Sequence, residues 1–97
     1  MPWALALHIA LLMLRLTTLH EGPSTVTIKI EGCIDAEGAR LLEKECRKHL
    51  RHQQSISLDC TSVTFVDQVG KEALQRLARD NVQILNCSEF IEELLRE

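Results

Sequence analysis

The stretch from Ser57 to Gly70 constrains the fold most, because its residue pattern changes from that of a strand to that of a helix. Apolar and polar residues alternate from 55 to 60, and this period of two predicts a half-buried strand. A polar elbow, Asp59 to Ser62, and a second apolar run, Val63 to Val66, follow. The stretch therefore carries the chain from the middle of a sheet to the start of a helix.

Asp67 directly precedes the helical pattern, which runs from Gln68 to Arg79. An aspartate in this position is a good N-cap, because its carboxylate accepts unpaired backbone N–H groups of the first turn. Loops at the carboxyl ends of strands are where α/β proteins usually place functional residues, so this loop is the candidate site. The side of the helix expected to be buried comprises Ala73, Leu74, Leu77 and Ala78.

Two strands are expected before this stretch, at Leu14–Leu19 and Thr25–Glu31. The second strand has the clearest pattern in the chain, with apolar residues at alternate positions. His20–Ser24, with Gly-Pro at its centre, predicts the turn between them. We expect a hairpin with one face open to solvent.

Asp35 is predicted to cap a helix from Ala36 to His52, after the chain leaves the sheet between Gly32 and Asp35. The apolar face of this helix comprises Ala39, Leu42, Cys46 and Leu50. Basic residues gather in its last two turns, at Lys44, Arg47, Lys48, His49, Arg51 and His52. Cations suit the C-terminal end of a helix dipole, so we interpret this cluster as a solvated helix end, with binding of an acidic partner as the alternative.

The last third of the chain predicts a short strand at Val82–Leu85, whose partner the pattern leaves open, and a helix capped by Ser88. The apolar stripe of that helix comprises Phe90, Ile91, Leu94 and Leu95. Helices between strands imply parallel crossovers, whereas the hairpin adds an antiparallel edge. The expected fold class is α/β, with a mixed, mostly parallel sheet of about four to five strands, an N-terminal β-hairpin and helices mainly on one face.

Composition excludes several functions. The chain has 97 residues, which suffice for one domain. Its aromatic residues are Trp3, Phe65 and Phe90 only, which argues against a stacking platform for single-stranded nucleic acid. The formal net charge of −3 argues against nucleic-acid binding in general.

The four cysteines, Cys33, Cys46, Cys60 and Cys87, form no CxxC pair and no Cys/His cluster, which argues against a zinc site. Each lies in an apolar pattern, and free cysteine packs as a small hydrophobic residue. We therefore expect four core thiols rather than disulfides, as fits a reducing cytoplasm.

Residues 1 to 12 are apolar, but the run is too short for a transmembrane helix and lacks the basic residues of a signal peptide. We interpret them as an N-terminal extension, arising from a misassigned start, before a single domain at 13–97. The alternative is an amphipathic membrane anchor. Arg15 is the only Lys or Arg before Lys29, so such an anchor would lack electrostatic help from anionic lipid.

Three segments together resemble the STAS domain family, named for sulfate transporters and anti-sigma factor antagonists. They are Glu31–Asp35, Leu58–Thr61 and the run from Val63 to Gly70, and the resemblance covers residues 14 to 97. It implies a mixed α/β fold and a partner protein that docks on the two loops before the helices. The residues it assigns to that surface are Asp35, Asp67, Gln68, Val69, Gly70 and Lys71.

Val69 departs from the family pattern. In phospho-regulated members of the family the residue before the glycine is Ser or Thr, and a kinase partner phosphorylates it at the helix N-terminus. Neither Val69 nor Gln68 has a hydroxyl group. The resemblance therefore implies that this position is not phosphorylatable. Thr61, Ser62 and Thr64 lie nearby, but the match does not place the phosphoacceptor there.

The expected protein is not an enzyme. His8, His20, His49 and His52 are scattered, and none is expected beside a nucleophile and a carboxylate. The chain has no Gly-rich phosphate loop. Asp59 and Asp67 could bracket a site, although we expect the first to bind turn amides and the second to cap its helix. We expect no catalytic residue, no metal and no cofactor.

The resemblance suggests a small, bacterial, cytoplasmic binding module in signal transduction and transcription regulation, of the anti-sigma factor antagonist type. Its expected partner is an anti-sigma factor or a related kinase-like regulator. One alternative is an accessory subunit of an ABC-type membrane transport complex, because similar domains bind transporter ATPases. Another is a weak nucleotide-binding domain or small enzyme at the same loops. We expect no nucleic-acid partner and no stable membrane insertion.

Overall fold

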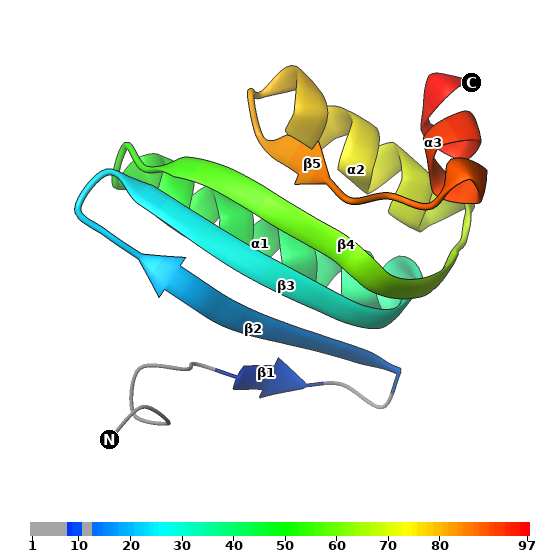
Figure 1. The fold of residues 1–97 in the computed structure, drawn as a ribbon, viewed down its shortest axis with the longest axis horizontal. Coiled ribbons are helices and arrows are strands. Elements are labelled where there is room, and N and C mark those ends of the chain that lie inside the picture. The colour runs from blue at the N-terminus through cyan, green and yellow to red at the C-terminus, as the bar shows by residue number, and fades with distance from the viewer. Residues whose placement is uncertain (1–7, 11–12) are drawn as a thin grey trace.

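The computed structural model describes residues 8–10 and 13–97, which form one mixed α/β unit (Figure 1). Its elements are β1 (His8–Ala10), β2 (Leu14–Glu21), β3 (Thr25–Ile34), α1 (Ala36–Arg51), β4 (Ser55–Val66), α2 (Gln68–Arg79), β5 (Gln83–Leu85) and α3 (Glu89–Arg96). No helix formed by the described residues is long and apolar enough to cross a membrane.

The described strands form one sheet in the order β1-β2-β3-β4-β5. β1 and β3 each pair antiparallel with β2, whereas β4 pairs parallel with both β3 and β5. The predicted hairpin and mixed sheet are confirmed, and β4 is the partner that the pattern left open for the last strand. Figure 1 shows α1 and α2 on one face of this sheet, with α3 beside α2.

The strands β3 and β4 run further than predicted. The expected exit from the sheet after Gly32 is wrong, because β3 continues to Ile34. The expected elbow at Asp59–Ser62 is also wrong, because β4 passes through it as one strand. At two points β4 has one residue more than the facing part of β3. Such bulges accommodate the extra residue without ending the pairing.

Gly32 stands at one of these irregular points, with φ +98°. A Cβ on this residue would lie 2.2 Å from the carbonyl oxygen of Met13, which directly precedes β2. Only glycine tolerates both the positive φ and the close approach without strain. This is why β3 can bend here and remain paired.

The core lies between the sheet and the helices. Its fully buried large side chains include Leu16, Ile28, Ile30, Ile34, Leu42, Ile56, Leu58, Leu74, Leu77 and Ile91. Two predicted core residues are exposed instead, Ala78 in α2 and Phe90 in α3. α3 packs against the core through Ile91, whereas the neighbouring Phe90 is 62% exposed.

The cysteines divide into two classes. Cys46 and Cys60 are buried, whereas Cys33 and Cys87 are half-buried, and all four are free thiols. The prediction of free thiols is confirmed, but the core placement is wrong for Cys33 and Cys87. Cys33 alternates with the buried Ile34 along β3, and Cys87 lies between β5 and α3.

The basic end of α1 is largely paired within the fold. Arg47 forms ion pairs with Glu43 and Asp80, and Lys48 pairs with Glu45 at 3.1 Å. His49 is buried, with Nδ1 2.7 Å from Oε1 of Gln54. Another residue of the predicted cluster, His52, is the C-cap of the helix. These contacts favour the interpretation of a solvated helix end.

Candidate functional site

The two capped helix starts are neighbours. Ile34 and Val66 are paired at the ends of β3 and β4. The residue after each strand, Asp35 or Asp67, is the N-cap of a helix. Asp35 Oδ1 accepts a hydrogen bond of 2.8 Å from the amide of Gly38. Asp67 Oδ1 accepts one of 2.8 Å from the amide of Gly70. Each carboxylate therefore stabilises its own helix, and α1 and α2 begin at the same edge of the sheet.

Gly70 fixes how closely α2 approaches this edge. A Cβ on Gly70 would lie 2.2 Å from the carbonyl oxygen of Ile34, a contact that no side chain tolerates. The same carbonyl accepts a 3.1 Å hydrogen bond from the amide of Asp67. The first turn of α2 is thus held against the end of β3 by its backbone, which makes this edge rigid.

Val69 and Gln68 form the outer side of that first turn. Val69 is 43% exposed. The Gln68 amide donates a 3.1 Å hydrogen bond to Glu72, one turn further along α2. The turn therefore presents an apolar side chain to solvent beside a polar one that is already engaged.

Lys71, which sequence comparison with the family placed on the same surface, is 8% exposed. Its ammonium group donates a 3.0 Å hydrogen bond to Oε1 of Glu97, at the end of α3. Gln75 also holds this segment, donating to the carbonyl oxygens of Leu95 and Glu97 at 3.0 Å each. Lys71 therefore holds the end of α3 against α2.

Phe65 was missed as a surface residue by sequence reasoning. It is 50% exposed and lies opposite Cys33, one residue before the paired ends of β3 and β4. The Cys33 amide donates to the carbonyl of Met13, and Met13 is 54% exposed. Exposed apolar side chains thus gather around the end of β3. No sequence signal marks Phe65 as exposed, because the bulges in β4 decide which way it faces.

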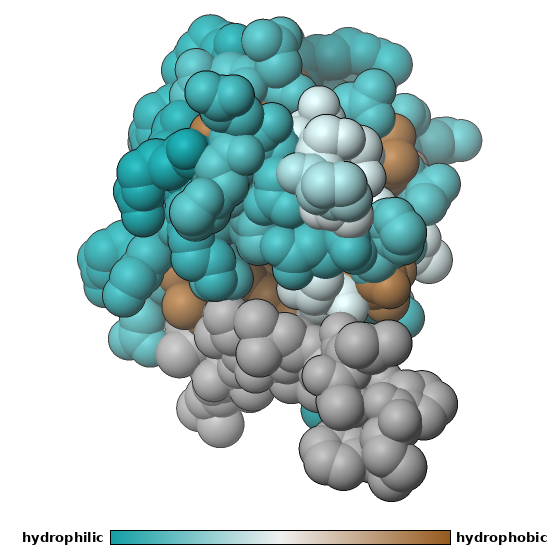
Figure 2. Space-filling model, turned by 90° about the vertical axis from the view of Figure 1, so that its left-hand side faces the viewer, coloured by the Kyte–Doolittle hydropathy of each residue, from teal (hydrophilic) through white to brown (hydrophobic). Residues whose placement is uncertain are grey.

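The opposite end of the sheet has a different character. Figure 2 views the molecule from the end that carries the β2–β3 and α1–β4 turns, and its coloured surface is mostly hydrophilic. Residues 51–53, at the end of α1 and in the turn that follows it, are all exposed and polar. The two helix starts lie at the other end of the sheet (Figure 1), which carries the exposed side chains of Phe65 and Val69.

Asp59 does not share a site with Asp67. Its Oδ1 accepts hydrogen bonds from the hydroxyl and the amide of Thr61 and from the side chain of Asn86, at 2.6, 3.0 and 3.3 Å. These bonds, the Thr61 hydroxyl first, lower the pKa of Asp59. Eight residues of extended chain, roughly 25 Å, separate it from Asp67. Asp59 binds the Thr61 amide, but within β4 rather than in the expected turn. Its distance from Asp67 excludes a site bracketed by the two carboxylates.

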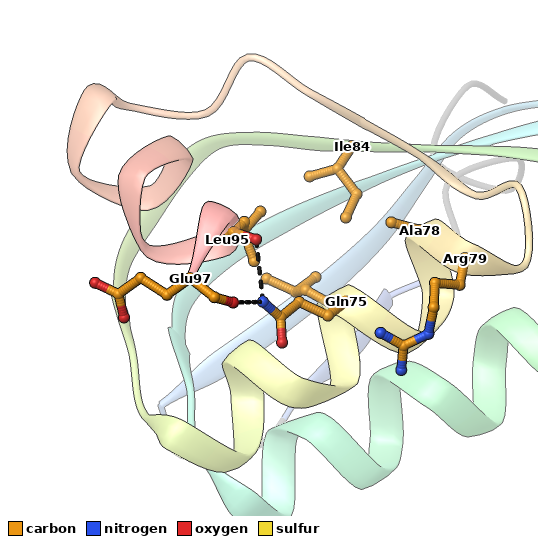
Figure 3. Close-up of a pocket in the computed structure, with 7 residues that line it drawn as sticks. Gln75, Ala78, Arg79, Ile84, Leu95 and Glu97 are labelled. Carbon is orange, nitrogen blue, oxygen red and sulfur yellow. Dashed lines mark hydrogen bonds between the residues drawn. The ribbon is translucent and has the colours of Figure 1, made fainter.

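A cavity of about 300 Å³ lies between α2, β5 and α3 (Figure 3). Its lining comprises Leu74, Gln75, Ala78, Arg79, Ile84, Leu95 and Glu97. The amide of Gln75 inside it is already bonded to the C-terminal carbonyls. Elsewhere in the described residues, no group of three or more His, Cys, Asp or Glu side chains is arranged to hold a metal ion.

Comparisons with known proteins agree with this architecture. A family model described as "Mlab, STAS domain" matches residues 17–96. Among solved structures, the chain is similar to one described as "Structure of the Anti-Sigma Factor Antagonist SpoIIAA in its Unphosphorylated Form". The likeness covers 84% of this chain and 77% of that one, with a TM-score of 0.64 and 13% sequence identity, and it shows the fold alone. No curated protein matches the chain.

Proposed function

Because this chain belongs to the STAS domain family, we propose that it is a non-enzymatic regulatory module that binds a partner protein at the edge where α1 and α2 begin. We call this surface the docking edge and define it as Asp35, Phe65, Asp67, Gln68, Val69 and Gly70. The proposal adds Phe65 to the residues that the resemblance assigned. It places Lys71 behind the edge, where Lys71 holds α3.

The observation that carries this proposal is the exposure of Val69 in a rigid turn. The Asp67 cap and the contact of Gly70 with the Ile34 carbonyl fix the turn before any partner arrives. A pre-organised apolar side chain loses little conformational entropy on binding, so its burial contributes more directly to affinity. Phe65, 50% exposed nearby, adds a large apolar surface of the kind that anchors protein interfaces.

The finer proposal concerns the partner. We propose that the partner is an anti-sigma factor or a related kinase-like regulator in the bacterial cytoplasm. Binding such a partner would give this protein a role in transcription regulation. The similarity of fold to an anti-sigma factor antagonist supports this choice. Val69 has no hydroxyl, so binding would not be switched by phosphorylation at this position.

Phosphorylation gives a direct test of the unswitched state. Purified protein, its Val69→Ser variant and a candidate kinase-like regulator from the same organism would be incubated with ATP and analysed by mass spectrometry. We expect phosphate at position 69 in the variant and none there in the unaltered protein. Binding of the unaltered protein should survive the incubation. Loss of binding, with phosphate on Thr61, Ser62 or Thr64, would contradict an unswitched module.

The missing hydroxyl also favours a second candidate, a permanent subunit of a membrane transport complex. Such a subunit needs a constant docking surface, not one that phosphate can close. Calorimetric titration of the purified protein with a transporter ATPase, and separately with an anti-sigma factor, would distinguish the two candidates. Saturable binding of only one identifies the class of partner. Binding of neither would contradict the proposed function.

A further inference from the structure

Two cysteine thiols far apart in the sequence meet between β4 and β5. Asp59 lies opposite Leu85 in this parallel pair, so Cys60, the next residue of β4, lies beside the turn that follows β5. Cys87 is in that turn, and the two thiols lie close enough for each to influence the pKa of the other. Both pack against the hydrophobic core.

The backbone holds Cys87 in this place. Asn86 has φ +61°, a conformation that turns the chain sharply after β5. Its side chain donates to Asp59, the neighbour of Cys60, at 3.3 Å. Ser88, on the other side of Cys87, caps α3 by accepting from the amide of Ile91 at 3.2 Å. Cys87 is therefore fixed between two local anchors.

We propose that Cys60 and Cys87 are an oxidative modification site, at which a small-molecule disulfide converts the two thiols into an intramolecular disulfide. Asp59 and Leu85 are paired on neighbouring strands, and Cys60 and Cys87 follow them by one and two residues, so the two backbones run side by side close to the separation that a disulfide spans. The proposal is independent of the docking edge.

The exposure of the two thiols sets the order of the steps. Cys87 is half-buried and Cys60 is 1% exposed, so the reagent reaches Cys87 first. The Cys87 thiolate attacks the reagent disulfide, forms a mixed disulfide and releases one reagent thiolate. The Cys60 thiolate then attacks the Cys87 sulfur and releases the second reagent thiolate. The two cysteine protons pass to the released thiolates, so two thiols and one disulfide yield one disulfide and two thiols.

The reaction should be slow but specific. Burial raises the pKa of both thiols, and a hydrogen bond with Cys60 partly offsets this for Cys87. Because the thiolate is the attacking species, the raised pKa values slow the exchange at neutral pH. The other two cysteines have different surroundings. The Cys33 sulfur lies 3.8 Å from the hydroxyl of Thr64, and Cys46 is buried in α1.

The bond would close the chain from residue 60 to residue 87 around α2. It would also tie the start of α3 to β4, whereas the reduced chain holds α3 only by side-chain contacts such as those of Lys71 and Gln75. Constraint of the unfolded chain by a loop of this size raises the melting temperature by ~5 °C or more.

Peptide mapping tests the proposal without ambiguity, because trypsin separates the four cysteines. Cleavage after Lys and Arg leaves Cys33 in peptide 30–40, Cys46 in 45–47, Cys60 in 52–71 and Cys87 in 80–96. Native protein would be treated with oxidised glutathione, blocked with iodoacetamide, digested and analysed without reductant. We expect peptides 52–71 and 80–96 to be linked, and the melting temperature to rise by ~5 °C or more.

Two variants complete the experiment. Cys87→Ser should abolish the linked peptide and the rise in melting temperature, whereas Cys33→Ser, a matched change at the other half-buried thiol, should preserve both. Three outcomes would overturn the proposal: a link that involves Cys33 or Cys46, a glutathione adduct on Cys87 that Cys60 does not resolve, or a link that forms only after unfolding.

Discussion

Gly70 and Val69 are adjacent residues in opposite surroundings, one against the backbone of β3 and the other exposed to solvent. Gly70 has no side chain because the Ile34 carbonyl occupies that space, and Val69 has an exposed side chain because the turn points outward. The first property determines whether α2 can begin here. The second determines what a partner would meet.

Gly70→Ala should destabilise the protein by about 1–3 kcal/mol, because the new Cβ forces α2 away from β3. Gly22→Ala is the matched control, since its Cβ would make an ordinary 3.5 Å contact with Thr25. Urea unfolding of the three proteins measures the difference. Equal stability of Gly70→Ala and the unaltered protein would show that the edge is not rigid.

Single residues differ in how far sequence can place them. Asp35, Asp67 and Ser88 were predicted as caps and are caps, because capping depends on a few neighbouring residues. The burial of Lys71 was not predictable, because it depends on where α3 ends in space. The exposure of Phe65 depends on bulges that shift the facing of β4.

Between elements, α1 and α2 are joined by charges. Glu43 accepts two hydrogen bonds from Arg76, 3.0 Å from Nε and 2.7 Å from Nη2. It also pairs with Arg47, whose guanidinium reaches Asp80 after α2. The hydrogen bond from Arg76 is the largest cause that lowers the pKa of Glu43.

This pairing should make stability depend on pH. The folded-state pKa of Glu43 lies below its unfolded value, so the pair stabilises the fold above the unfolded pKa. That stability is lost as the pH falls through the folded value. Glu43→Gln should therefore lower the melting temperature most near pH 7, and the difference should shrink in acid, below about pH 4. A pH-independent difference would mean that the ion pair contributes nothing.

The helices were predicted more accurately than the strands. α2 has the predicted bounds, and α1 ends one residue early, because capping and helical spacing are local signals. The ends of β3 and β4 depend on each other, since each strand supplies the hydrogen bonds that the other needs. The polar residues Asp59–Ser62 resemble the end of a strand when the sequence of β4 is read without its partner strand β3.

At the scale of the molecule, β1 lies at the edge of the sheet, paired with β2 from His8 to Ala10. The rest of the STAS unit has its core between β2–β5 and the helices. We propose that the domain comprises residues 13–97. A chain that starts at Met13 should then keep its fold and lose less than ~2 kcal/mol, the value of burying about one large apolar side chain. Urea unfolding of the two lengths tests this, and a larger loss would show that the first twelve residues belong to the core.

The fold class was predictable because the order of strands and helices leaves few topologies. The pairing of β5 and the bulges were not, because they depend on contacts between distant segments. For the docking edge, sequence placed the two caps and Val69 but not the apolar neighbours that the sheet brings to them.

The central claim is that Val69 lies at the centre of a rigid surface that a partner buries, and one paired measurement tests it. Melting temperature and partner affinity would be compared for the unaltered protein, Val69→Asp and Leu19→Asp, a control that alters an exposed apolar residue on β2. A carboxylate suits a helix N-terminus, so Val69→Asp should keep its stability or gain ~0.3–1 kcal/mol. Its affinity should fall about tenfold or more, because the charge is desolvated in the contact, while Leu19→Asp binds normally. An unfolded Val69→Asp, or a folded one with unchanged affinity, would contradict the account.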